Sequence, residues 1–239
     1  MSRTLQVFVI GQSPRLDIEA QVALVARDAK ISVEGVLDGM SLEQIADRVV
    51  PESDRDAVFA TLSSGDTVTV SKQMVTTRLS AKLETGGPAL LWSTASFQDL
   101  PRRHDFVQPA ELLTMMIDVL LPTGTLGLIV PRCRQLDMQT KERSRPGLHV
   151  VAAALAPRSD HAAVDAAAFQ LVAQKPDLAI MDCMSYTRLE MARVSATLSC
   201  LVLLPAVAAT QAAAALLAMD RMESSVRHSL SDHGPKPGR

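Results

Sequence analysis

The stretch Leu178-Ala179-Ile180-Met181-Asp182-Cys183-Met184-Ser185-Tyr186-Thr187 decides the fold. Its first four residues form an unbroken apolar run, which is typical of a strand in a parallel sheet that is covered on both faces. The residues that follow are small or polar. In open α/β sheets, ligands bind outside the carboxyl ends of the strands. We therefore expect a ligand site centred on Asp182 and Cys183.

Similar apolar runs recur along the chain and alternate with helix-like segments. Strands are expected at residues 5–10, 31–37, 66–71, 89–92, 126–130, 148–152, 178–181 and 200–204. Helices are expected at about residues 17–28, from the capping-box residue Ser41, before Gly124, and at residues 162–174 and 205–222. This alternation predicts an α/β fold of βαβ units with mostly parallel sheets.

The runs divide into two similar Rossmann-like halves, each with an open parallel sheet. We expect the first half at residues 1–110, joined by the C-terminal helix at 205–222, and the second half at residues 111–204. Residues 223–239 are polar and end in a Gly/Pro-rich segment, so a flexible tail is expected there.

The composition excludes several classes of protein. The net charge is −2, which does not favour binding to a phosphate backbone, and aromatic residues, on which bases could stack, make up only 3%. No nucleic acid partner is therefore expected. The Ala/Leu-rich stretch at 206–219 contains Thr210 and Gln211, so we interpret it as a buried helix and expect no membrane span. The three cysteines fit no metal or disulfide pattern, which favours a cytoplasmic protein without a metal site.

The residues that follow the strands are small hydroxyls, thiols and a few cations, which suit a small carboxylate. The candidate substrate-binding residues are Gln12, Ser13, Arg15, Thr94, Ser185, Tyr186 and Thr187, and the candidate catalytic residues are Cys183 and Ser93. No GxGxxG, Walker or GxSxG motif is present, so nucleotide binding has no positive signal and no cofactor is implied.

Each candidate also has a structural alternative. Cys183 precedes a helix whose N-terminus would lower the thiol pKa, but a free cysteine is also often a buried hydrophobe. Asp182 would raise that pKa if it faces the thiol, or could cap the helix. Arg15 could be solvated, and Tyr186 could be half-buried packing. Helix capping is the alternative role for Ser93 and Thr94.

Five segments in order resemble the AroM family. They are residues 10–17 (Ile-Gly-Gln-Ser-Pro-Arg-Leu-Asp), 37–41 (Leu-Asp-Gly-Met-Ser), 66–71 (Asp-Thr-Val-Thr-Val-Ser), Val130-Pro131 with Gln135, and 181–187 (Met-Asp-Cys-Met-Ser-Tyr-Thr). Together they span about residues 5 to 218. The AroM family is in turn distantly similar to the aspartate/glutamate racemase superfamily.

The resemblance implies two α/β halves with a ligand cleft between them. Racemases of that superfamily use one cysteine from each half as acid and base beside a carboxylate. Cys183 matches the second-half cysteine, whereas Ser93 stands where the first-half cysteine is expected, and Ala95 and Ser185 replace glycines. A serine hydroxyl is far less acidic than a thiol, so two-base racemisation is disfavoured. One-face chemistry, such as decarboxylation or isomerisation, is still open to a single thiol.

Three hypotheses follow. The first is a cofactor-independent racemase-, isomerase- or decarboxylase-like enzyme that acts on a small carboxylate through Cys183. The second is a non-catalytic carboxylate-binding or regulatory protein that lost the first cysteine. The third is a redox sensor that pairs Cys133 with Cys183. A homodimer is possible under each of them.

Overall fold

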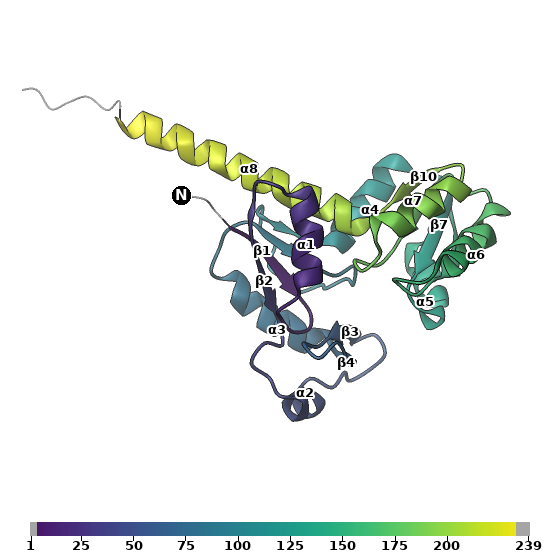
Figure 1. The fold of residues 1–239 in the computed structure, drawn as a ribbon, viewed down its shortest axis with the longest axis horizontal. Helices are drawn as coiled ribbons and strands as arrows, with labels where there is room; N and C mark the ends of the chain where they lie inside the picture. Colours follow the sequence, from purple (N-terminus) through teal and green to yellow (C-terminus); the bar gives the residue numbers. More distant parts are fainter. Residues whose placement is uncertain (1–3, 233–239) are drawn as a thin grey trace, which may run out of the picture. The chain divides into compact units, whose positions relative to one another are not determined.

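The chain forms two compact units, and the computed structural model describes residues 4–232. Unit 1 contains residues up to Leu91, the segment Asp99–Val107 and the part of the last helix from Thr210. Unit 2 contains Trp92–Gln98 and Gln108–Ala209. Figure 1 shows the elements of both units in sequence colours.

Unit 1 is built on a four-stranded parallel sheet. Its strands are β1 (Thr4–Val9), β2 (Lys30–Gly35), β5 (Ala89–Leu91) and β6 (Phe106–Val107), in the spatial order β2-β1-β5-β6. The helices are α1 (Leu16–Val25), α2 (Leu42–Arg48) and α3 (Lys72–Leu83). An antiparallel hairpin of β3 (Ala57–Thr61) and β4 (Thr67–Ser71) lies between α2 and α3 in the chain.

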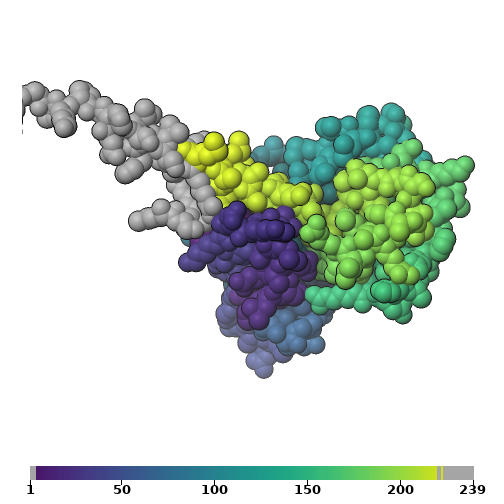
Figure 2. All heavy atoms as spheres, turned by 45° about the horizontal axis from the view of Figure 1, so that its top comes forward, coloured from purple at the N-terminus to yellow at the C-terminus, as the bar shows by residue number. Residues whose placement is uncertain are grey.

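Unit 2 is built on a second four-stranded parallel sheet. Its strands are β7 (Gly124–Val130), β8 (Leu148–Ala154), β9 (Leu178–Met181) and β10 (Leu201–Leu203), in the order β10-β9-β7-β8. The helices are α4 (Pro109–Leu120), α5 (Leu136–Arg143), α6 (His161–Val172) and α7 (Arg188–Thr197), with a short 3-10 turn, η1 (Cys133–Gln135), before α5. Side chains of α6 and α7, drawn in green, form a continuous surface of this unit in Figure 2.

The two parallel sheets share one topology. When the parallel strands are numbered along the chain within each unit, both sheets have the order second, first, third, fourth. The chain therefore reverses its direction of travel between the first and third strands, which are β1 and β5 in unit 1 and β7 and β9 in unit 2. In doubly wound folds this switch point marks the ligand site. The predicted α/β fold with two open parallel-sheet halves is confirmed.

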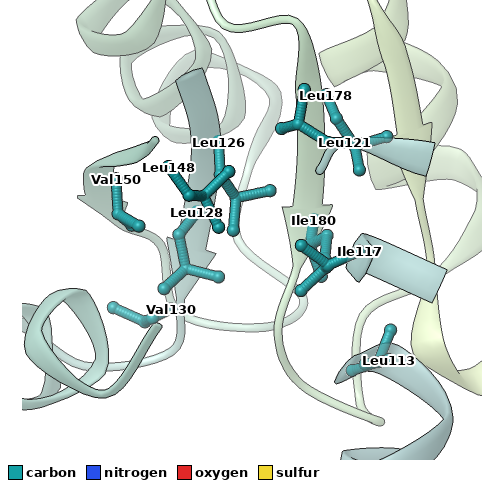
Figure 3. Packing of buried hydrophobic residues seen from close by; sticks show 10 residues of the cluster. All are labelled: Leu113, Ile117, Leu121, Leu126, Leu128, Val130, Leu148, Val150, Leu178 and Ile180. Carbon is teal, nitrogen blue, oxygen red and sulfur yellow. The ribbon is translucent and has the colours of Figure 1, made fainter. Parts of the chain in front are cut away.

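Aliphatic side chains fill the core of unit 2, as the low aromatic content predicts. In Figure 3, Ile117 of α4 lies next to Ile180 of β9, and Leu113 of α4 belongs to the same buried cluster. The buried cluster contains Leu113, Ile117, Leu121, Leu126, Leu128, Val130, Leu148, Val150, Leu178 and Ile180. This packing fixes the register of β7 against β9 and so the position of the residues that follow each strand.

The last helix is longer than expected. Helix α8 runs Pro205–Asp232, beyond the predicted end at residue 222, because no glycine or proline interrupts it before Gly234. The predicted flexible tail at residues 223–239 thus overlaps α8, and residues 233–239 lie outside the described residues. Within residues 4–232, no helix combines the length and the apolar character needed to cross a membrane.

Candidate functional site

Cys183 and Ser93 occupy the same position in the two sheets. Each is the second residue after the third strand, since β9 ends at Met181 and β5 ends at Leu91. Their local hydrogen bonds also match. The backbone N–H of Ser185 donates to Cys183 Sγ at 3.5 Å, and the backbone N–H of Ala95 donates to Ser93 Oγ at 3.1 Å. The equivalence suggested by the family resemblance therefore has a structural counterpart in strand position and turn geometry.

The segment that carries Ser93 is part of unit 2. Trp92–Gln98 packs in unit 2, although β5 itself belongs to unit 1. Thr94 Oγ1 donates to the carbonyl oxygen of Asp182 at 3.4 Å. Ser93 is buried and Thr94 is half-buried. The structure thus brings the Ser93–Thr94 pair to the strand end that carries Asp182 and Cys183.

Backbone hydrogen bonds fix the Cys183 turn. The N–H of Asp182 donates to Ile129 O at 2.7 Å, which extends the pairing of β9 with β7 by one residue. The N–H of Cys183 then donates to Met181 O at 2.8 Å, and the N–H of Tyr186 donates to Cys183 O at 3.4 Å. The chain turns sharply as it leaves the sheet, and the thiol is held half-buried at the switch point.

The expected lowering of the thiol pKa is wrong. Burial raises the pKa of Cys183 above its ordinary value, and the negative charges of Asp182 and Glu190 raise this pKa further, while the hydrogen bonds from Ser185 oppose the shift. The predicted cause is missing because α7 begins only at Arg188, and its N-cap is Thr187. A helix terminus acts within about its first turn. Cys183 is therefore a neutral thiol at neutral pH.

Asp182 is a buried carboxylate rather than a helix cap. Its side chain is 3% exposed, and Oδ2 accepts from Nη2 of Arg143, whose side chain is 12% exposed, at 2.6 Å. Arg143 is the last residue of α5, 39 positions away in sequence. Sequence reasoning missed Arg143 because it ends a largely polar helix that buries none of its residues, and only its side chain reaches the strand end.

Tyr186, predicted to bind substrate, is fully buried, with no exposed surface with which to contact a ligand. Its hydroxyl donates to the carbonyl oxygen of Leu155 at 2.5 Å. Burial raises the pKa of the Tyr186 hydroxyl, so it stays protonated and keeps this bond. Tyr186 joins the Cys183 turn to the segment that follows β8.

Thr187 also has a structural role. Its hydroxyl caps α7 and exchanges hydrogen bonds with Glu190, accepting from the backbone N–H at 3.2 Å and donating to Oε2 at 2.8 Å. Glu190 is buried, and its Oε1 accepts from the backbone N–H of Arg158 at 2.7 Å. The capping box therefore fixes the start of α7 to the loop after β8. Of the predicted residues in this turn, Cys183 and Ser185 are left half-buried and available.

The predicted residues of unit 1 hold its own loops together. Gln12 Nε2 donates to Met40 O at 2.8 Å, and Gln12 Oε1 accepts from Ser63. Ser13 donates through its backbone N–H and its hydroxyl to the two oxygens of Asp38, at 2.7 and 2.6 Å. All these contacts lie at the carboxyl end of β1, the first strand of the sheet.

Arg15, predicted to assist anion binding, is paired with a neighbouring carboxylate. Its Nε and Nη2 donate to Asp17 at 2.9 and 2.8 Å. To bind a ligand, Arg15 would have to share or give up this pair. Gln12 and Ser13 would likewise have to release contacts within unit 1.

The three cysteines are free and differ in environment. Cys133 is exposed in η1, and Cys200 is partly buried just before β10. Burial also raises the pKa of Cys200. In the part of the chain that the structure describes, no group of three or more His, Cys, Asp or Glu residues is placed to hold a metal ion.

Comparisons with known proteins settle the family. A family model described as AroM protein matches residues 5–217. The chain belongs to the AroM family. The resemblance carried by the five sequence segments is thus confirmed. Comparison with curated proteins gives no match.

One solved structure supports the fold of this AroM protein. It is a cysteine mutant of arylmalonate decarboxylase in a sulfate-associated form, which aligns with a TM-score of 0.59 at 14% identity over 90% of this chain and 94% of that chain. The match supports the predicted α/β fold with two parallel-sheet halves. A second structure, described as XylFII molecule, aligns with a TM-score of only 0.30 at 12% identity over 82% and 75% of the two chains.

Proposed function

We propose that this AroM protein is a cofactor-independent enzyme that acts on a small carboxylate, with Cys183 as its single acid. The observation that carries the proposal is the matched position of Cys183 and Ser93. Both follow the third strand of a doubly wound sheet, and both accept a hydrogen bond from the N–H two residues later. Cys183 and Ser93 thus correspond to the two members of an acid–base pair, with a serine in place of one of them.

The chemistry that suits a neutral thiol is proton donation to carbon. In a decarboxylation of this kind, the bond between the α-carbon and one carboxylate breaks, carbon dioxide leaves, and the electron pair delocalises into the remaining carboxylate as an enolate. The S–H proton of Cys183 then passes to one face of the α-carbon. The thiolate that results is stabilised by the hydrogen bonds from Ser185 and regains a proton from solvent.

The substrate carboxylate is proposed to bind beside this turn. Thr94 and Ser185 are half-buried there and carry hydroxyl donors. The bond from Thr94 Oγ1 to Asp182 O is long, at 3.4 Å, so a carboxylate oxygen could replace it at small cost. Ser93 is assigned to contact the substrate without acting as a base at neutral pH.

A screen in D2O tests the proposal. The protein is incubated with small malonates, amino acids and 2-substituted carboxylates, and proton NMR follows loss of carbon dioxide or replacement of the α-hydrogen by deuterium. We expect turnover with at least one class. Cys183→Ala should abolish that turnover, while Cys133→Ala, which removes an exposed thiol after β7, should preserve it. Full turnover by Cys183→Ala would disprove the role of Cys183.

Ser93→Cys extends the test to the first half. The substitution places a thiol at both matched positions, so the enolate left by decarboxylation should receive its proton on both faces of the α-carbon instead of one. Loss of enantiomeric excess in the product is the readout. A product protonated on one face only, with the new thiol shown by alkylation to be present and reduced, would contradict the assigned equivalence.

The second candidate function is a carboxylate-binding protein without catalysis. Two observations favour it: serine replaces the first cysteine, and burial holds the pKa of Cys183 above its ordinary value. This candidate predicts saturable binding of a small acid, measured by calorimetry, with no exchange of the α-hydrogen. Detection of exchange that depends on Cys183 would exclude it.

A further inference from the structure

We propose that Arg143 is a positioning residue for Cys183, which acts by neutralising the carboxylate next to the thiol and so keeps the thiol able to release its proton. The inference rests on the proposed function in so far as proton release serves catalysis. The effect of Arg143 on proton release by Cys183 is a property of the free protein and can be measured without a substrate.

Arg143 and Asp182 form a largely buried ion pair. Arg143 Nη2 lies 2.6 Å from Asp182 Oδ2, and the two side chains are 12% and 3% exposed. The backbone N–H of Asp182 is fixed to Ile129 O at 2.7 Å, so the carboxylate is held beside Cys183 at the end of β9. Because both side chains are largely shielded from water, their charges are screened less than charges on the protein surface are.

The Arg143–Asp182 ion pair lacks the hydrogen bonds that would make it stabilising. Among the described residues, Arg143 Nε and Asp182 Oδ1 are buried and have no hydrogen-bond partner. Each buried polar atom left unpaired destabilises the folded state, because it has lost its hydrogen bonds to water without replacement. A buried ion pair joined by one hydrogen bond barely offsets the desolvation of its two charges. We therefore assign the pair an electrostatic role: Arg143 is in contact with the carboxylate of Asp182, whose negative charge raises the pKa of the neighbouring thiol.

Two carboxylates and one arginine carry charge close to Cys183. Asp182 and Glu190 are negative and disfavour the thiolate, and Tyr186 is neutral. The charge of Glu190 is spread over bonds from Thr187 and from the backbone N–H of Arg158. Arg143, from α5, is the cation in direct contact with Asp182. Removal of Arg143 would leave the charge of Asp182, next to the thiol, uncompensated.

The experiment is the alkylation rate of Cys183 by iodoacetamide against pH, resolved by peptide mass, in the full-length protein. Arg143→Gln leaves the Asp182 charge unpaired and should move the midpoint of the profile up by about one pH unit, a roughly tenfold lower rate at a fixed pH below it. Asp182→Asn leaves the Arg143 charge unpaired and should move the midpoint down. The double variant should lie between the two.

Opposite shifts distinguish electrostatics from loosening. A structural role would open the turn in both single variants, increase solvent access, and move both midpoints the same way. Arg143→Lys keeps the charge and should restore a midpoint near that of the wild type. Arg193→Gln breaks a more exposed ion pair in the same unit, with Asp165 at 2.5 Å, and should leave the Cys183 profile unchanged.

Folding of each variant is checked by circular dichroism. If Arg143→Gln does not fold, the comparison of Asp182→Asn with the double variant carries the same test, because adding Arg143→Gln to that background must raise the midpoint. Equal midpoints in these two variants, or single-variant shifts of one sign, would overturn the inference. Failure of the proposed function would instead appear as absence of turnover with the alkylation shifts intact.

Discussion

Tyr186→Phe removes one buried hydroxyl and little else. The Tyr186 hydroxyl donates to Leu155 O at 2.5 Å, and the residue has no exposed surface. Its removal leaves a buried carbonyl unpaired, which costs about 1–3 kcal/mol. For a chain of this size that free energy corresponds to a fall in the melting temperature of about 2–12 °C. The loss is measured by thermal and urea unfolding followed by circular dichroism.

A matched control isolates burial as the cause. The exposed Ser159 hydroxyl donates to Ala156 O at 2.7 Å in the loop that follows Leu155, so Ser159→Ala removes the same kind of bond where water can replace it. We expect Ser159→Ala to change stability by no more than about 0.5 kcal/mol. Equal stability of Tyr186→Phe and the wild type would refute the assignment of Tyr186 as a buried anchor of the Cys183 turn.

Three further predictions concern packing and pH. Gly11→Ala should lower the free energy of unfolding by about 3 kcal/mol or more, because a Cβ there would lie 1.7 Å from the carbonyl oxygen of Thr61 and force the two segments apart. Expression yield and the urea midpoint measure this loss. Leu126→Ala, in the fully buried core of unit 2, should cost about 3–5 kcal/mol, whereas Leu24→Ala, at 59% exposure, should stay within about 0.5 kcal/mol in the same urea assay. Cys183 holds its proton more tightly in the folded protein than in the unfolded chain. The free energy of unfolding should therefore fall as pH rises above the unfolded thiol pKa of about 8.5. Urea unfolding at pH 7.5 and 9.5 measures this fall, which should be smaller in Cys183→Ala.

Local sequence pattern was sufficient to predict much of the sheet. The apolar run at 178–181 coincides with β9, and the runs at 5–10 and 126–130 each end within one residue of β1 and β7. Such strands lie at the centre of their sheets and are buried on both faces, which produces the unbroken apolar pattern. The shared strand order could not be predicted in this way, because it depends on which strands pair and not on the composition of any one strand.

Elements with weak apolar patterns were missed. Helix α5 buries none of its residues, and β6 contains only Phe106 and Val107, too few for a pattern to form. The 66–71 strand was recognised from its alternation, but its antiparallel partner β3 was missed, although Ser64 and Gly65 mark a turn between the two strands.

The place of Asp182 and Cys183 in the fold could be predicted, because it depends on backbone position alone. Asp182 and Cys183 follow a recognisable strand, and the structure places them at a switch point of the sheet. Long-range contacts could not be predicted: the Arg143 pair joins residues 39 positions apart, and the bond from Tyr186 to Leu155 joins residues 31 apart. The direction of the Cys183 pKa shift depends on burial and on the charges of Asp182 and Glu190, which a local sequence pattern does not reveal.

The central claim is that Cys183 delivers one proton to one face of a carbanion next to a carboxylate. The most direct test is the product formed in D2O from a substrate identified by the carboxylate screen, with NMR in a chiral environment to locate the deuterium. The account predicts one deuterium on a single face of the α-carbon with the wild type and with Cys133→Ala, and loss of turnover with Cys183→Ala. Deuterium on both faces with the wild type, or an unchanged single-face label with Cys183→Ala, would contradict it.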